Sequence, residues 1–165
     1  TKIEGFAFLP ITSFMMALTT FVSQNRGAKE YERARKGAHF GLVCSVSLAE
    51  TIGLLIALFA TPLMRLFVDD PQVIQYGVER AHYATILFFL LAYSHGVSAV
   101  LRGVGKSVVP MVVMLVCWCL VRVTLLTMLN MLFHNILFVY LIYPFTWSLS
   151  SIVFFLYYRK INWQE

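Results

Sequence analysis

Charge is scarce in this chain, and its absence is concentrated in long stretches. Only 13% of the residues are Asp, Glu, Lys or Arg, whereas 59% are hydrophobic and the mean hydropathy is +0.76. A water-soluble domain of this composition would have to hide 14 Phe in one small core, and helices that are apolar on every face belong in lipid or deep inside a large protein. The composition therefore indicates a membrane protein.

Patterns typical of enzymes are also missing. The sequence contains no paired carboxylates, no His-rich metal spacing and no activated nucleophile, so we expect no catalysis, no metal site and no cofactor. Cysteine is rare, and Cys44, Cys117 and Cys119 all fall within apolar stretches, where we read them as packing residues. Cys117 and Cys119 are two residues apart on a predicted helix and point to different faces, which argues against a paired metal site.

Five apolar stretches are each long enough to cross a bilayer. About 20 residues at about 1.5 Å per residue are needed to cross about 30 Å of hydrocarbon. The stretches are residues 5–25, 40–64, 82–101, 107–133 and 136–158. They predict an all-α polytopic transmembrane bundle with five spans. Residues 28–38 read as an amphipathic helix at the lipid headgroups, with Glu32 placed to pair with Lys36.

The basic residues predict the orientation of these spans. Most of the 13 Lys and Arg follow the first, third and fifth stretches: Arg26, Lys29, Arg33, Arg35 and Lys36, then Arg102 and Lys106, then Arg159 and Lys160. The other ends carry only Lys2, Arg65 and Arg80. The positive-inside rule then predicts a multi-pass protein of the cell membrane with an outer N-terminus and a cytoplasmic C-terminus. This charge pattern favours lipid over nucleic acid as a partner. The chain opens at Thr1 without a Met, and an odd number of spans begins on the outer side. We therefore expect at least one further helix before this segment.

Three titratable residues near the middle of the spans are the first functional candidates. Glu50 and Arg122 are the only formally charged residues inside the five stretches, and a carboxylate at this depth costs about 2.5–3.5 kcal/mol on insertion scales. A permanent ion pair between Glu50 and Arg122 is one interpretation. The other is that Glu50 binds a proton or a sodium ion, or contacts substrate. His95 lies at a similar depth. Its side chain could relay protons, or it could form a hydrogen bond between two helices.

Other residues are candidates for the wall of a cavity and for hinges. Aromatic and methionine side chains could line a cavity for a flat cation, and the candidates are Phe14, Met15, Met16, Tyr83, Phe88, Phe89 and Tyr93. Proline removes a backbone donor and can bend a helix, so Pro110 and Pro144 are hinge candidates, against the alternative of static packing. Between stretches two and three, Asp70 is a candidate helix N-cap that precedes Pro71.

Several short segments, in this order and spacing, resemble the multidrug and toxic compound extrusion (MATE) family. They are PITSF at 10–14, TFVSQNRGA at 20–28, ERA at 32–34, KG at 36–37, LFVDD at 66–70, LRGVGKSVVP at 101–110 and VRV at 121–123. They include the residues of two predicted cytoplasmic turns, Gln24, Asn25 and Gly27 in one and Arg102, Gly103 and Gly105 in the other. Asn25 or Gly27 is expected to end the first helix in a left-handed conformation.

The resemblance implies a fold of two six-helix lobes, with this chain as helices eight to twelve. The missing N-terminal lobe would be its partner. It also implies efflux of organic, often cationic, compounds driven by inward flow of sodium ions or protons, by alternating access of the two lobes. Several family members place coupling acids on helices seven and ten, but residues 82–101 carry none, and Glu79 lies near the outer end.

Antiport of organic compounds is therefore the predicted function, and two alternatives remain. A related flippase of lipid-linked oligosaccharides would have a more basic cavity and would ignore small drug cations. A membrane scaffold subunit would carry no flux and would tolerate Glu50→Gln fully.

Overall fold

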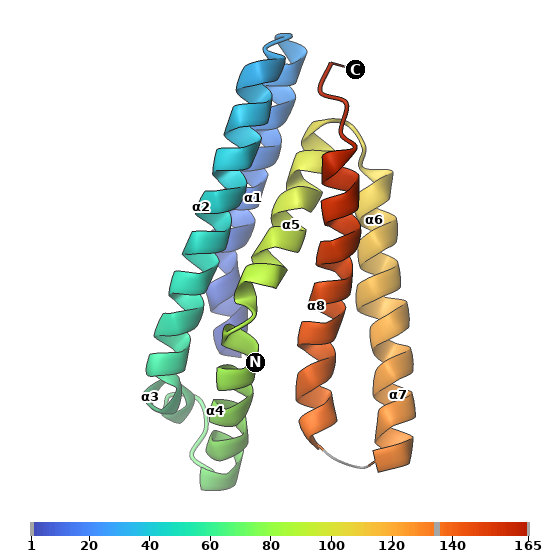
Figure 1. Cartoon of the computed structure of the whole chain (residues 1–165). Helices are drawn as coiled ribbons and strands as arrows, with labels where there is room; N and C mark the ends of the chain where they lie inside the picture. Colours follow the sequence, from blue (N-terminus) through green and yellow to red (C-terminus); the bar gives the residue numbers. More distant parts are fainter. Residues whose placement is uncertain (1, 134–135, 165) are drawn as a thin grey trace.

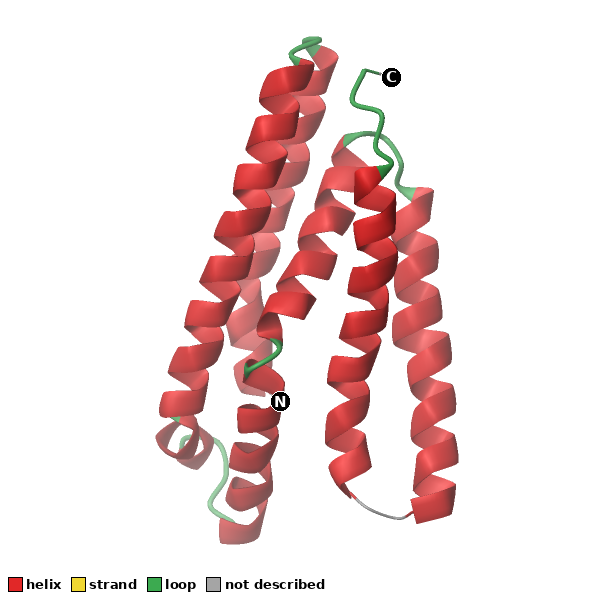
Figure 2. Ribbon diagram, in the orientation of Figure 1, coloured by secondary structure: helices red, strands yellow, loops and turns green. Residues whose placement is uncertain are grey.

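Every regular element in the described part of the chain is helical (Figure 2). The computed structural model describes residues 2–133 and 136–164, with the side chains of residues 2–4, 6, 7, 84, 133 and 136–138 outside the description. In chain order the elements are α1 (Lys2–Gly27), α2 (Tyr31–Leu58), α3 (Ala60–Arg65), α4 (Pro71–Thr85), α5 (Phe88–Gly103), α6 (Val108–Met114), the π-helical segment η1 (Leu115–Val121), α7 (Arg122–Phe133) and α8 (Ile136–Arg159). The predicted all-α transmembrane bundle is confirmed.

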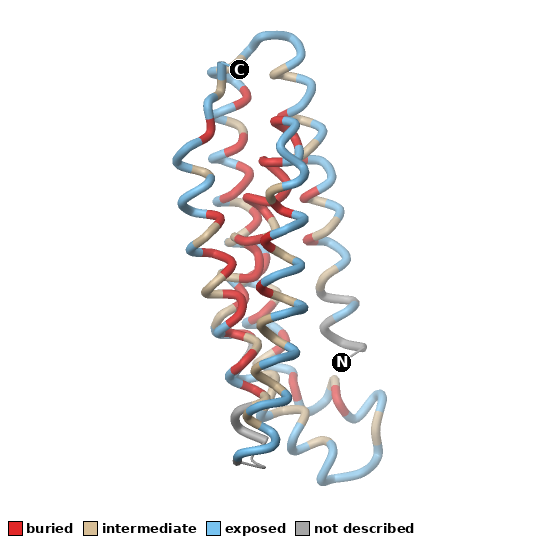
Figure 3. The backbone as a smooth tube through the Cα atoms, turned by 90° about the vertical axis from the view of Figure 1, so that its right-hand side faces the viewer, coloured by how far each residue is buried: buried red, intermediate tan, exposed pale blue. Residues whose placement is uncertain are grey.

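The long helices lie side by side in an elongated bundle (Figure 1). Helix α5 has the central place, because it packs against α1, α2 and α8, while α7 packs on the outer side of α8. The buried residues follow these contacts along the axis of the bundle, and pale, exposed positions cover its flanks (Figure 3). Many exposed positions are large and apolar, such as Met16, Leu54, Val123 and Phe145, as expected of a surface that faces lipid.

The count of spans differs from the predicted five. Three helical segments are long and apolar enough to cross a membrane, namely Tyr31–Leu58, Val108–Leu132 and Val139–Arg159, and a bent pair of helices, Pro71–Tyr83 with Phe88–Gly103, raises the count to four. That count covers the described residues only, and part of the start of α1 lies outside them. Helix α1 nevertheless runs for 26 residues through the first predicted stretch.

Two predicted boundaries around α2 are wrong. Residues 28–38 do not form a separate surface helix, because α2 begins at Tyr31 and continues to Leu58 without interruption. Its first turns bury Ala34 and Ala38, and no proline separates them from the span. The second stretch was expected to run to residue 64, but α2 ends at Leu58 and a separate short helix, α3, follows. The Glu32–Lys36 ion pair is confirmed, with 3.4 Å between its charged atoms.

The two predicted cytoplasmic turns share one backbone geometry. After α1, Glu30 N donates to Asn25 O and Lys29 N donates to Arg26 O; after α5, Lys106 N and Gly105 N make the equivalent bonds to Leu101 O and Arg102 O. Each pair of bonds defines a Schellman motif, which needs one left-handed residue. Gly105 fills that position after α5 with φ +83°. After α1 the left-handed residue is Lys29, with φ 61°, not the predicted Asn25 or Gly27.

The third and fourth predicted spans contain irregularities that were not predicted from the sequence. The stretch 82–101 is divided by a two-residue turn at Ile86 and Leu87, and the helices before and after it differ in direction by 62°. The break contains neither Pro nor Gly. The stretch 107–133 is interrupted by η1, and π-helical turns inside α-helices occur frequently at functional sites. The predicted loop between spans four and five falls on residues 134–135, outside the described residues.

Candidate functional site

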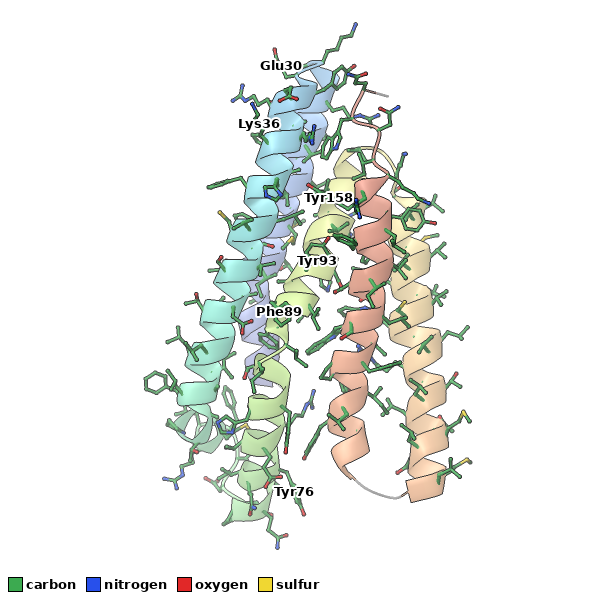
Figure 4. All side chains as sticks on the ribbon, in the orientation of Figure 1. Glu30, Lys36, Tyr76, Phe89, Tyr93 and Tyr158 are labelled. Carbon is green, nitrogen blue, oxygen red and sulfur yellow. The ribbon has the colours of Figure 1, made fainter. Side chains whose placement is uncertain are left out.

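The break between α4 and α5 is held by a carboxylate from α2. Glu50 is half-buried, and its Oε2 accepts a hydrogen bond from the backbone nitrogen of Phe89 at 3.2 Å. Leu87, the N-cap of α5, provides no side-chain cap of its own. One turn beyond Glu50, Gly53 allows Thr85 O to lie 3.1 Å from the point where a Cβ would sit. Figure 4 labels Phe89 at this break.

The position of Glu50 explains how a carboxylate is tolerated inside a span. The first backbone N–H groups of a helix lack intrahelical partners, and the positive end of the helix dipole attracts an anion. Glu50 satisfies one of these groups at the start of α5. In the membrane interior, where water cannot solvate either group, both gain from this contact. Glu50 lies within the observed span Tyr31–Leu58, as the sequence indicated, but the sequence could not identify a helix end as its partner.

Arg122 has different partners, so the predicted ion pair with Glu50 is not formed among the described residues. The guanidinium donates to Thr146 Oγ1 from Nε at 3.2 Å and from Nη2 at 2.6 Å. Its Cζ lies 4.6 Å from the ring centroid of Tyr143 and 5.0 Å from that of Trp118. The reason is topological: α5 packs between α2, which carries Glu50, and α8, which receives Arg122 (Figure 1).

His95 lies between two aromatic rings and is not paired with Glu50. Its ring makes edge contacts with Phe8, at 4.9 Å between centroids, and with Trp118, at 5.1 Å. Trp118 thus contacts both His95 and Arg122. The Nε2 atom of His95 is buried and has no hydrogen-bond partner among the described residues. Of the three predicted midplane residues, the structure therefore links His95 and Arg122 through one indole and leaves Glu50 separate.

A buried serine cluster next to this indole was missed by sequence reasoning. Ser94 of α5 lies 3.0 Å from Ser150 and 2.9 Å from Ser151 of α8, measured between hydroxyl oxygens. Trp118 Nε1 donates to Ser150 Oγ at 3.2 Å, and Ser151 Oγ donates to Leu90 O at 2.9 Å. Small hydroxyl residues commonly join helices in membranes, so the three serines within residues 148–151 were an available signal.

The aromatic and methionine residues predicted to line a cavity lie in different surroundings. Met15 is 4% exposed and belongs to the core, whereas its neighbour Met16 is 73% exposed. Tyr83 is exposed on α4 and stacks on Tyr140 of α8 with 6.3 Å between centroids. Tyr93, labelled in Figure 4, is half-buried on α5. Met15 and Met16 therefore cannot face one common cavity as a pair, while Tyr83 and Tyr93 remain candidates.

The remaining candidates take part in packing. Pro110 and Pro144 are both buried, and Pro144 lies within α8, which continues through it from Ile136 to Arg159. The direction change in the bundle occurs at the α4–α5 break instead. Gly103 allows α5 to approach α1 closely, because a Cβ there would lie 2.8 Å from Val22 Cβ and 2.9 Å from Thr19 O.

The two turns with the family-like segments are joined to each other. Arg26 donates from Nη1 to the carbonyl of Val104, which connects the turn after α1 to the turn after α5. Asn25 Nδ2 donates to Phe21 O at 2.8 Å, and Gln24 O accepts from Ala28 N. These residues close helix ends. Within the described residues no group of three or more potential ligands could hold a metal ion.

The fold and the site together define a polytopic helical membrane protein with a polar interior and one discontinuous span. The chain matches the MatE family over residues 1–128, which is most of its length. It therefore belongs to this family, and the resemblance noted in its sequence is confirmed.

Curated relatives have names that agree with this family. A probable multidrug resistance protein NorM of Thermotoga maritima is 30% identical over 112 residues, which are 68% of this chain and 24% of that protein. The probable multidrug resistance protein YoeA of Bacillus subtilis is 23% identical over 99% of this chain and 35% of its own length. An FAD transporter of Shewanella oneidensis is 29% identical over 46% of this chain and 17% of its own length. The chain thus spans a third or less of most of these relatives.

Proposed function

We propose that this chain forms most of one lobe of a transporter that exports small organic compounds by alternating access, driven by inward flow of sodium ions or protons. Membership of the MatE family supports the class, and the names of two relatives support multidrug efflux. The C-terminus lies on the cytoplasmic side of the cell membrane in this proposal, and a second lobe of the same protein completes the pathway.

The observation that carries the mechanism is the discontinuous span with a carboxylate at its break. Discontinuous helices near the midplane are the places where many transporters bind substrates and coupling ions. When Glu50 binds a proton, its attraction to the positive end of α5 falls, and a sodium ion would compete with Phe89 N for the same oxygens. Either event loosens the hydrogen bond between Glu50 and Phe89 and lets α5 change its angle to α4.

We place the substrate-binding region on the other side of α5, around Arg122. Arg122, Trp118 and Tyr143 present one guanidinium and two aromatic rings, and Thr146 holds the guanidinium in place. Aromatic faces attract flat organic cations, whereas the guanidinium attracts anionic groups. In this proposal both features belong to the substrate pathway, and His95, in contact with Trp118, senses movement of the same indole.

A flavin nucleotide is the second candidate substrate, and one observation favours it. Arg122 has no carboxylate partner among the described residues, so its charge is available to a phosphate, and the neighbouring rings can stack on an isoalloxazine. The matched relative from Shewanella oneidensis is named an FAD transporter. An anionic aromatic substrate would use the guanidinium directly, whereas a cationic one would need it to be shielded.

The test is an export assay with the complete protein that contains this chain, in cells that lack their own efflux pumps. The cells are loaded with a fluorescent organic cation, and external FAD is measured in parallel, under imposed sodium or proton gradients. Gradient-dependent loss of the dye supports multidrug efflux, and release of FAD alone supports the flavin nucleotide. Export of neither compound at normal expression would contradict both and favour a flippase or a scaffold.

A further inference from the structure

A cavity of about 1010 Å³ lies between the first turns of α2 and the end of α8. One wall comes from α2 and includes Arg35, Lys36 and His39; the other comes from α8 and the residues after it, and includes Tyr158, Arg159 and Trp163. Figure 4 labels Lys36 and Tyr158 at this end of the bundle. The cavity is remote from Glu50 and from Arg122, so the transport proposal does not use it.

The charge in this cavity is mainly positive. Among the described residues that line it, Glu32 is the one acidic residue, and its carboxylate is already paired with Lys36. Arg35 and Arg159 are exposed and make no ion pair with another described residue. The guanidinium of Arg159 lies 5.6 Å from the ring centroid of Phe155, which keeps it at the end of α8. Two guanidinium groups from two helices are therefore available to one anion.

The lining changes from charged to apolar along α2. Phe40 and Val43 follow His39 along this wall, and they are 71% and 53% exposed. On the opposite wall Tyr158 and Trp163 make an edge contact with 6.4 Å between centroids. Tyr and Trp are enriched where hydrocarbon meets headgroups. The cavity thus combines a cationic mouth, an aromatic pair and an apolar strip.

Its level in the membrane is set by the spans themselves. The candidate span of α2 begins at Tyr31 with charged first turns, and the last candidate span ends at Arg159. Both walls therefore lie where helices leave the hydrocarbon. The turns after α1 and α5 and the end of the chain lie at the same end (Figure 1). Most of the basic residues gather in these segments, which is the pattern of a cytoplasmic surface.

We propose that this cavity binds the headgroup of an anionic phospholipid. Arg35 and Arg159 hold the phosphate from two sides, Tyr158 and Trp163 lie at the level of the glycerol, and an acyl chain runs along Phe40 and Val43. Basic pockets between membrane helices on the cytoplasmic side bind such headgroups. The bound lipid joins α2 to α8, two helices that both pack against α5 and make few direct contacts with each other.

The experiment is native mass spectrometry of the complete purified protein, titrated with phosphatidylglycerol, phosphatidylcholine or inorganic phosphate. Each basic residue near a membrane surface contributes about 1 kcal/mol to the binding of anionic lipid, which is about fivefold in affinity. We expect phosphatidylglycerol to bind more tightly than phosphatidylcholine, and Arg35→Gln and Arg159→Gln each to weaken it about fivefold. Arg33→Gln is the matched control, because Arg33 is exposed on the same turn but does not line this cavity.

Three results would overturn the proposal. Equal binding of the two lipids by the unmodified protein would show that charge does not select the ligand. An equal loss in the Arg33→Gln control would show a general effect of surface charge. Inorganic phosphate that binds as tightly as phosphatidylglycerol, with the same dependence on Arg35, would show a free-anion site. Arg35 and Arg159 lie on different helices, so a folding defect in one variant leaves the other to decide.

Discussion

Glu50 and Phe89 are joined across two helices, with 3.2 Å between the carboxylate Oε2 and the backbone nitrogen. This contact places the one carboxylate found in the five apolar stretches on the positive end of a broken helix. It also connects the second half of α2 to the first turn of α5. In the proposed transport mechanism, a proton or a cation that binds Glu50 weakens this connection and releases the break in the span.

The first prediction concerns the hydrogen bond itself. Glu50→Ala leaves the backbone nitrogen of Phe89 without a partner, so we expect a loss of about 1–3 kcal/mol in the free energy of unfolding. Glu50→Gln keeps a carbonyl oxygen that can accept the same bond, and we expect a smaller loss. Thermal unfolding of the complete protein in detergent measures both. An equal loss in the two variants would contradict the capping role.

The close approach of α5 to α1 is tested by alanine substitutions at two glycines. A Cβ at Gly103 would lie 2.8 Å from Val22 Cβ and 2.9 Å from Thr19 O, whereas nothing lies within 4 Å of one at Gly27. Overpacking costs about 1–3 kcal/mol, so Gly103→Ala should lower the unfolding temperature and Gly27→Ala should change it little. Because Thr19 O belongs to the backbone, the strain cannot be relieved by a side-chain rotation alone. If Gly103→Ala is as stable as Gly27→Ala, the helices are farther apart than described.

The serine cluster offers a matched pair on one helix. Ser94→Ala removes the hydroxyl that contacts both Ser150 and Ser151, and we expect it to cost about 1 kcal/mol. Ser98 is also buried, but its hydroxyl has no hydrogen-bond partner among the described residues. Ser98→Ala should therefore be neutral or slightly stabilising. Chemical unfolding of the two variants compares them directly, and the reverse order of stability would be inconsistent with the cluster.

Thr146 is predicted to matter because it holds Arg122. Thr146→Val keeps the shape of the side chain but removes the oxygen that accepts two bonds from the guanidinium. Hydrogen bonds to charged groups contribute about 1.5–3 kcal/mol, so a loss of this size is expected in the free energy of unfolding. Thr127→Val is the control, since that exposed hydroxyl bonds only to Val123 O on its own helix. Comparable losses of unfolding free energy in the two variants would show that the hydrogen bonds from Arg122 to Thr146 do not stabilise the protein.

Much of the fold follows from where charges are absent. The apolar runs located the long helices, Asp70 caps α4 through a 2.8 Å bond to Gln72 N as predicted, and α4 starts at Pro71. The break at Ile86 and Leu87 was not predictable from local sequence, because it contains no residue that disfavours a helix. It is stabilised by Glu50, which is distant in sequence, and by the space at Gly53.

The candidate site was only partly predictable, for a similar reason. Intramembrane charge identified Glu50 and Arg122, but two opposite charges at similar depth suggested a pair that the packing of α5 prevents. Depth along a helix can be estimated from residue spacing, whereas the face on which a side chain lies depends on which helices are neighbours. Left-handed Lys29 is a further example, because the Schellman bonds fix the position and Gly27 lies two residues too early.

Ion coupling at the break between α4 and α5 is tested by measuring gradient-driven export by the complete protein with Glu50→Gln. The control is Glu79→Gln, because Glu79 is exposed and bonds Gln75 on its own helix. At equal amounts of folded protein, we expect Glu50→Gln to lose export driven by a sodium or proton gradient and Glu79→Gln to retain it. Undiminished gradient-driven export by Glu50→Gln would contradict a coupling role and leave Glu50 as a structural cap of α5.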